Sequence, residues 1–176
     1  MKKIITIGGS NSKKSINKVL AEYTGGLIDD VELLKVNLND FDMPLFSIDI
    51  EDQLGIPSGA KELNTIIEQA DGFVISLAEH NGSYSVAFKN AFDWLSRING
   101  AVWRNKPMIL LTAAPGERGG ITMMNIALDR FPYLGAKIVG NMTFPLFNDN
   151  FKNGAIVNAE LKSNLLKIVG EFEKAI

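Results

Sequence analysis

The chain has 176 residues, which suits one domain with a full hydrophobic core and is too short for two ordinary domains. Its composition, 46% hydrophobic and 22% charged, is typical of a soluble globular protein, and its net charge of −2 gives no electrostatic reason to expect nucleic acid or an anionic membrane as partner. It has no cysteine, which excludes disulfides, thiolate chemistry and cysteine-ligated metal and fits a reducing compartment.

The amino terminus resembles a signal peptide only weakly, because two lysines precede a short apolar run. This run ends at Gly8, far short of the roughly 7–15 apolar residues that the core of a signal peptide needs. No other stretch approaches the roughly 20 apolar residues of a membrane-spanning helix. We therefore expect a cytoplasmic protein with no membrane partner.

Apolar residues alternate between short continuous runs, which predict buried strands, and spacings of three and four, which predict amphipathic helices. In chain order, the predicted strands are residues 4–7, 31–36, 72–78, 107–113 and 137–144. The predicted helices begin at Ser15, at Ser58 as a cap, near residue 87, near residue 121 and after Asn158 as a cap. Residues 37–57, rich in asparagine, aspartate, proline and glycine, are predicted to form one long loop.

The predicted order is therefore βαβαβαβαβα, with no internal repeat, low-complexity tract or linker. Strands that are continuously apolar must be buried on both faces, which indicates a parallel sheet between two layers of helices. Residues 1–176 are expected to form a single α/β domain. In such folds ligands bind at the carboxyl ends of the strands, near the point where the strand order reverses.

The first predicted strand leads into a polar loop at the start of a helix. The loop reads Gly8-Gly9-Ser10-Asn11-Ser12-Lys13-Lys14-Ser15-Ile16-Asn17. Hydroxyl groups, amides and the free N–H groups of a helix start are suited to holding a phosphate. The loop contains neither G-x-x-x-x-G-K-[ST] nor G-x-G-x-x-G. The alternative interpretation is a polar loop in which Ser15 is an ordinary helix cap.

Two further loops follow predicted strands at the same edge, at residues 78–85 and 114–120. Their small residues would let backbone amides approach a flat ring. The one histidine, His80, has no cysteine or arrayed carboxylates to form a catalytic triad, and no second histidine to form a metal site. We interpret His80 as a planar packing residue beside a ligand, or alternatively as a solvated loop residue.

Together these loops resemble the NADPH-dependent FMN reductase family, a flavodoxin-like group that includes quinone, azo-dye and chromate reductases. The family motif G-S-x-R-x-x-S-x-N corresponds to residues 9–17. P-E-Y-N-G-S followed by L-K-N-A-[IF]-D-W corresponds to residues 78–83 and 88–94, and S-P-G-x-x-G-G to residues 114–120. The resemblance implies a flavodoxin-like, doubly wound α/β fold: a five-stranded parallel sheet of order 2-1-3-4-5 with helices on both faces.

The resemblance also assigns residues to FMN. Those expected at the phosphate are Ser10, Ser12, Ser15, Ile16 and Asn17. Those expected around the isoalloxazine ring are Glu79, His80, Asn81, Gly82, Pro115, Gly116 and Gly119. No side chain is expected to be catalytic and no metal is expected, because the flavin carries the chemistry.

Three positions depart from the family pattern. Ser12 replaces the family arginine, His80 replaces its tyrosine and Ala78 replaces its proline. Lys13 and Lys14 are candidates to supply the missing charge, although an ammonium lacks the bidentate geometry of a guanidinium. These departures concern FMN affinity and substrate range more than the fold.

The implied activity is hydride transfer from NADPH or NADH through FMN to quinone-like or other small oxidants by a ping-pong mechanism, with His80 and Tyr84 lining the acceptor site. The alternatives are a flavodoxin-type electron carrier and a non-catalytic module that binds a phosphate-containing ligand. Within residues 88–94, Trp94 is interpreted as a core residue, and Lys89 and Asp93 as an i,i+4 charge pair.

Four apolar residues of the predicted long loop would be costly if they formed an exposed patch. They are Phe41, Met43, Leu45 and Phe46. Similar proteins are dimers that pack a corresponding segment against the partner's flavin site. We therefore expect a homodimer or a dimer of dimers.

Overall fold

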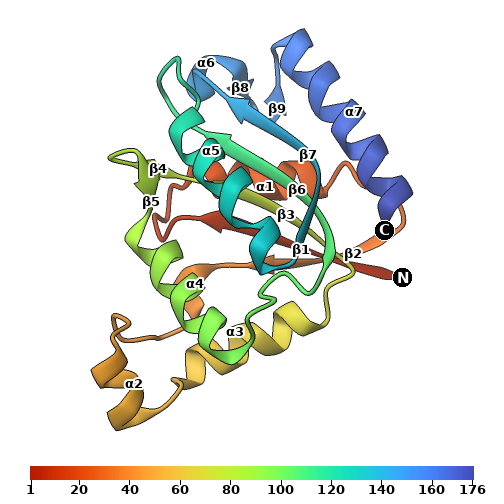
Figure 1. Cartoon of the computed structure of the whole chain (residues 1–176). Coiled ribbons are helices and arrows are strands. Elements are labelled where there is room, and N and C mark those ends of the chain that lie inside the picture. The colour runs from red at the N-terminus through yellow and green to blue at the C-terminus, as the bar shows by residue number, and fades with distance from the viewer.

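Five parallel strands form the central sheet, in the order β2-β1-β3-β6-β7, in the computed structural model, which describes residues 1–176 (Figure 1). The sheet strands are β1 (Lys2–Gly9), β2 (Val31–Val36), β3 (Gly72–Leu77), β6 (Lys106–Ala113) and β7 (Ala136–Phe144). Numbered among themselves, these strands have the order 2-1-3-4-5, so the predicted sheet is confirmed. Two small hairpins are added: β4 (Glu79–His80) with β5 (Ser83–Tyr84), and β8 (Phe151–Lys152) with β9 (Ala155–Ile156).

Helices cover both faces of the sheet, as predicted. The α-helices are α1 (Ile16–Gly25), α2 (Ile48–Leu54), α3 (Ser58–Glu68), α4 (Val86–Ile98), α5 (Ile121–Arg130), α6 (Phe147–Asn150) and α7 (Ala159–Ala175). Two short 3₁₀ turns are η1 (Leu38–Asp40) and η2 (Pro132–Leu134). No helix combines the length and the apolar character needed to span a bilayer.

Each face of the sheet has its own apolar core. Successive strand residues point to opposite faces, so Ile5 and Phe73 pack under α3, α4 and α5, whereas Ile4 and Val74 pack under α1 and α7. All six residues of β3 are buried, which agrees with its continuously apolar sequence. The two-layer burial explains why apolar runs were a reliable signal for these strands.

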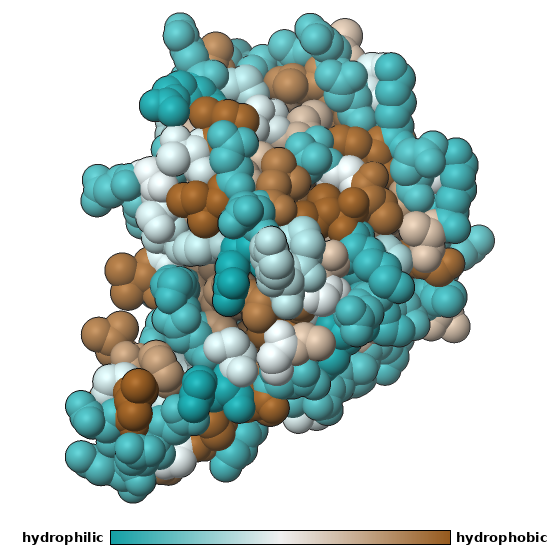
Figure 2. Space-filling view, viewed as in Figure 1, coloured by the Kyte–Doolittle hydropathy of each residue, from teal (hydrophilic) through white to brown (hydrophobic).

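The prediction of one long loop over residues 37–57 is wrong, because this segment contains η1 and the helix α2. The Ser47 hydroxyl oxygen accepts a hydrogen bond from the Ile50 N–H, and Gly55 ends the helix with a φ of 69°. None of the residues of α2 is buried, so the helix has no core-facing stripe for a periodicity argument to detect. It projects from the body at the lower left of Figure 1, and brown apolar atoms lie on the same projection in Figure 2.

Of the two caps predicted at helix starts, one is confirmed and one is wrong. The Asn158 side chain accepts hydrogen bonds from the N–H groups of Glu160 and Leu161, as expected of a cap. Ser58 is instead the first residue of α3, and Pro57 occupies the cap position without a side-chain bond. Pro57 has the extended conformation of a cap residue, with φ fixed near −65° by its ring, so the helix begins one residue earlier than a serine cap at position 58 would place it.

The two edges of the sheet have different surroundings. At the carboxyl edge, β1, β3 and β6 lead into the three loops that the sequence singled out. At the amino edge, Lys2, Lys106 and Ile176 line one open depression, and both marked ends of the chain lie there in Figure 1.

Candidate functional site

A hollow of about 250 Å³ opens at the carboxyl edge, where β1, β3 and β6 end. Residues from all three loops line it: Ser10, Ser12, Lys14, Ser15, Ile16, Asn17, Ala78, Glu79, His80, Ala113, Ala114 and Pro115. Strand order reverses between β1 and β3 in this sheet, so the hollow lies where ligands of doubly wound folds bind.

The structure brings eight of the twelve residues expected at a ligand into this one hollow. They are Ser10, Ser12, Ser15, Ile16, Asn17, Glu79, His80 and Pro115. The other four, Asn81, Gly82, Gly116 and Gly119, lie outside its lining. Lys14 joins the lining, whereas Lys13 does not, so of these two candidates Lys14 is the one that can bring a positive charge to the hollow.

The first loop can lie close to α1 because Gly8, just before it, has no side chain. A Cβ atom at Gly8 would lie 2.5 Å from Lys18 Cα, so only glycine lets β1 pass under the first turn of the helix. The loop then folds back on its own hydroxyl groups. Ser12 N–H donates to Ser10 Oγ at 3.1 Å, and Lys14 N–H donates to Ser12 Oγ at 3.2 Å.

Several donors at the start of α1 remain free for a ligand. Ser15 caps the helix, since its Oγ accepts from Lys18 N–H at 3.1 Å. The backbone N–H groups of Ile16 and Asn17 have no partner within the chain. The hydroxyl groups of Ser10 and Ser12 only accept hydrogen bonds within the loop. Each therefore keeps its own hydrogen free to donate to a ligand. These donors, with the positive end of the helix, fit a phosphate group.

The second loop is the tight hairpin of β4 and β5. Its turn residues Asn81 and Gly82 have φ of 52° and 75°, and two positive φ values in a two-residue loop are typical of a type I′ turn. These two residues therefore shape the hairpin and do not face the hollow. His80, next to the turn, is exposed and lines the hollow.

Glu79 fastens the hairpin to α5. Its Oε2 atom accepts a hydrogen bond of 3.0 Å from the N–H of Met123, the third residue of that helix. The cap residue of α5 is Gly120, which has no side chain to serve this N–H. Glu79 thus completes the start of a helix more than forty residues away in the sequence.

The third loop is fixed mainly by its glycines and by Thr112. The hydroxyl of Thr112 donates to the Gly119 carbonyl at 2.8 Å. Gly119 has a φ of 59°, and a Cβ there would lie 2.9 Å from the nitrogen of Pro145. Gly119 therefore packs the loop against the end of β7 and does not line the hollow. Gly116 is exposed, and its carbonyl accepts from the N–H of Leu146 at 3.1 Å.

Sequence reasoning missed buried hydroxyls that join the loops. Ser85 caps α4 through Phe88 N–H and also donates to the carbonyl of Gly9 at 2.8 Å, which ties the hairpin to the first loop. Ser76 and Thr112 are fully buried. The signal was available, since a serine or threonine near the end of an otherwise apolar strand needs a buried hydrogen-bond partner.

Tyr84 does not line the hollow, in contrast to the expectation for the acceptor site. Its ring stacks on Phe88 and Phe131 at centroid distances of 5.5 and 6.4 Å, within an aromatic cluster of the core. Its hydroxyl is buried and has no hydrogen-bond partner. Burial raises the pKa of Tyr84 to about 12, partly opposed by the nearby charge of Arg130.

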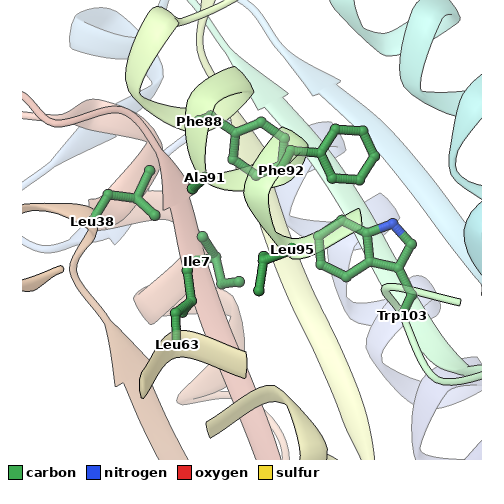
Figure 3. A pocket seen from close by; sticks show the side chains of 8 residues that line it. All are labelled: Ile7, Leu38, Leu63, Phe88, Ala91, Phe92, Leu95 and Trp103. Atoms are coloured by element: carbon green, nitrogen blue, oxygen red, sulfur yellow. The ribbon is translucent and has the colours of Figure 1, made fainter. Parts of the chain in front are cut away.

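A second, much smaller cavity lies in the core, between β1, α3 and α4 (Figure 3). Its volume is about 10 Å³, and the eight side chains that face it in Figure 3 are all apolar, among them Ile7, Leu63 and Phe92. Such a space is at the lower limit for one water molecule and offers it no polar partner. The cavity is a packing void and cannot hold a cofactor.

Comparison with known proteins gives an independent result. The family model described as NADPH-dependent FMN reductase matches residues 2–150. A quinone reductase of Escherichia coli (strain K12) is 32% identical over 117 residues, which are 66% of this chain and 62% of that protein. A 2-hydroxy-1,4-benzoquinone reductase of Burkholderia sp is 27% identical over 175 residues, 97% of this chain and 93% of that protein.

Among solved structures, FerB, a flavoenzyme NAD(P)H:(acceptor) oxidoreductase from Paracoccus denitrificans, superposes with a TM-score of 0.78. The two sequences are 22% identical, and the match covers 99% of this chain and 97% of that one. This likeness shows a shared fold. The chain spans less than two thirds of the length of the Escherichia coli relative.

Proposed function

Because the chain belongs to the NADPH-dependent FMN reductase family, we propose that it is an FMN-dependent oxidoreductase with NADPH or NADH as electron donor. The observation that carries the proposal is the hollow in which phosphate-binding groups at the start of α1 lie beside two loops of small residues. When bound, FMN supplies the hydride and electron transfer, so no side chain is needed as a general base.

The chain's own residues would bind and orient the cofactor. The hydroxyls of Ser10 and Ser12 and the N–H groups of Ile16 and Asn17 would hold its phosphate, with charge supplied by Lys14. The small side chains of Ala78, Ala113, Ala114 and Pro115 leave room for a flat ring. His80 would lie at the exposed rim of that ring.

We further propose that donor and acceptor use the same open side of the hollow in turn, which gives a ping-pong reaction. The acceptor would be a quinone-like or other small, flat oxidant. The names of the relatives, which include a quinone reductase, an NADPH azoreductase and a 2-hydroxy-1,4-benzoquinone reductase, support an acceptor of this kind. A cytoplasmic location is part of the proposal, since the reaction needs a compartment that supplies reduced nicotinamide.

Rapid mixing of the FMN-loaded protein with NADPH, and separately with NADH, tests the activity. We expect at least one donor to bleach the flavin absorbance within seconds. Steady-state rates with a small quinone should give parallel double-reciprocal lines. If neither donor reduces the flavin, the reductase proposal fails. Intersecting lines would reject the ping-pong mechanism alone.

We also propose a homodimer. Of the four apolar residues predicted as a patch, Phe41 and Met43 pack on the core and Phe46 packs on Trp94, whereas Leu45 is 68% exposed. Three further apolar residues are equally open: Ile48 at 66%, Leu54 at 74% and Val86 at 72%. We name Leu45 and these three residues together the outer patch, and exposed apolar groups of this number favour burial against a second surface.

Sedimentation of the unmodified protein and of a Leu45→Ser, Ile48→Ser double variant tests the homodimer. At micromolar concentration the double variant should be a monomer, whereas the unmodified protein should be a dimer. The two substitutions should not lower the melting temperature of the monomer. Leu166→Ser, at a leucine of α7 that is 46% exposed outside the outer patch, is the matched control and should remain dimeric. A monomeric unmodified protein would reject the proposal.

A further inference from the structure

The Asn17 side chain is engaged by the sheet and is hardly accessible to a ligand. Only 2% of the residue is exposed. Its Oδ1 atom accepts two hydrogen bonds, from Ser76 Oγ at 2.7 Å and from Ala113 N–H at 2.8 Å. Its Nδ2 atom donates to the Ala113 carbonyl at 3.1 Å. Both lone pairs of the amide oxygen and one of its two N–H bonds are therefore used within the chain.

The partners of Asn17 belong to the two strands that lead into the other loops. Ser76 lies in β3, where it is level with Gly8 of β1 and Leu111 of β6, two residues before Ala78 in the hollow. Ala113 is the last residue of β6 and itself lines the hollow. One amide group thus connects the start of α1 to the carboxyl ends of two different strands.

From this arrangement we infer that Asn17 is a positioning residue: its side chain sets the spacing between the first loop and the loops at residues 78–85 and 114–120. A phosphate is held by the free N–H groups and the serine hydroxyls at the start of α1, and not by the Asn17 amide. The inference rests on the proposed function for the identity of the ligand, but the hydrogen bonds that carry it belong to the chain alone.

The physical reason is that Asn17 bonds to two strands at once. Thr112 bonds within the β6 side to the Gly119 carbonyl and Ser85 bonds to the Gly9 carbonyl, whereas the Asn17 amide bonds to both β3 and β6. A buried amide removed from this position leaves the Ala113 N–H and carbonyl and the Ser76 hydroxyl without their partner. Buried polar groups seek a new partner or water, and the segments that carry them move to find one. Loss of the Asn17 side chain should therefore increase the mobility of the third loop where it follows Ala113, far from Asn17 in the sequence.

Amide hydrogen exchange of the protein without flavin tests the inference directly. In Asn17→Ala, we expect exchange at Ala113 and in residues 114–120 to become at least tenfold faster, with α7 unchanged. Asn11→Ala removes the same side chain from an exposed position of the same loop and should change neither segment. Unchanged exchange in Asn17→Ala would overturn the inference, whether or not the protein binds flavin.

Flavin affinity gives the second arm, with FMN and riboflavin as probes. A positioning residue predicts that Asn17→Ala weakens both by a similar factor, roughly tenfold, and alters the visible circular dichroism of bound flavin at saturation. Ser76→Ala, at a residue with no exposed surface, should change both affinities in the same direction. It also serves if Asn17→Ala does not fold.

A loss confined to FMN would instead make Asn17 a direct phosphate ligand and overturn the inference. If the unmodified protein binds neither probe, the proposed function fails, and the exchange experiment still decides the role of Asn17.

Discussion

Residues 9–17 connect β1 to α1 and residues 41–57 connect η1 to α3, and the side chains of the two segments are satisfied in different ways. In the first, buried groups bond to each other: Asn17 bonds to β3 and β6, and Ser85 donates to the Gly9 carbonyl. In the second, Asn90 and Trp94 of α4 donate to the carbonyl of Pro44, while Leu45, Ile48 and Leu54 of the outer patch face solvent.

The comparison distinguishes two kinds of group without a partner: free polar donors and exposed apolar side chains. Polar groups of a connection can be satisfied by bonds within one chain, and the free donors that remain then mark a ligand site. Apolar side chains that face solvent have no such internal solution, and a second apolar surface is what completes them. By this reasoning the first loop lacks only a small ligand, and the proposed homodimer would cover the outer patch.

The largest effect is expected at Gly8. In Gly8→Ala, the new Cβ would lie 2.5 Å from the backbone of Lys18, and we expect a loss of about 3 kcal/mol in the free energy of unfolding. Chemical denaturation measures it. Gly170→Ala, in α7 with open space around it, should stabilise the protein by about 0.5–1 kcal/mol. A Gly8→Ala protein as stable as the parent would show that α1 is not pressed against β1.

A smaller effect is expected at Asn90, which holds the second connection. Its side chain bonds to Phe46 N–H at 2.8 Å and to the Pro44 carbonyl at 3.0 Å. Asn90→Ala should cost about 2 kcal/mol and speed hydrogen exchange in residues 41–57 while leaving residues 9–17 unchanged. Asp93→Asn, one turn along the same helix, breaks only a surface ion pair and should cost about 0.5 kcal/mol or less. Faster exchange in both connections would contradict their independence.

An effect of about 1 kcal/mol is expected at Glu79, because its carboxylate supplies the missing cap of α5. Glu79→Ala should lower the free energy of unfolding by that amount and speed exchange of the Met123 amide. Glu79→Gln keeps an acceptor oxygen and should lose about half as much, since only the charge at the helix start is removed. Glu117→Ala, at an exposed acid of the third loop, is the control. Equal stability of all three variants would reject the cap.

The smallest effect is expected at Tyr84 and depends on pH. Its pKa in the folded state is about 12, above the ordinary value of 10.0, so the stability it contributes is present below pH 10 and is lost as pH rises through 12. Tyr84→Phe should remove this part of the alkaline loss, at most about 1 kcal/mol because the residue is partly exposed. Denaturation curves at pH 9 and 11.5 measure it, with Tyr133→Phe as the control at an exposed ring. Identical pH dependence in parent and variant would contradict it.

The sheet could be predicted from sequence because its signal is local. Each continuously apolar run, such as residues 72–78, is explained by burial on both faces, and the glycine-rich turns mark where the strands end. The position of the three loops at the carboxyl edge could be predicted from the alternation of strands and helices alone. Eight of the expected ligand residues do line one hollow, because the carboxyl ends of neighbouring parallel strands must lie together.

The errors arise where the deciding contact is distant or absent. Asn17 bonds to residues 59 and 96 positions away, and no spacing rule reveals such partners. Gly119 must be a glycine because a Cβ atom there would collide with Pro145, which comes after α5 and β7 in the sequence. The helix α2 has a serine cap but no buried face, so periodicity could not detect it.

The strand β6 joins the two ends of the molecule, since Lys106 lines the depression that also contains Lys2 and Ile176, and Ala113 lines the hollow. Its eight residues span roughly 26 Å at about 3.3 Å per residue. A linker attached at either end of the chain would hold the protein on a bead or an electrode with the hollow turned outward. The hollow would then stay open to molecules in solution.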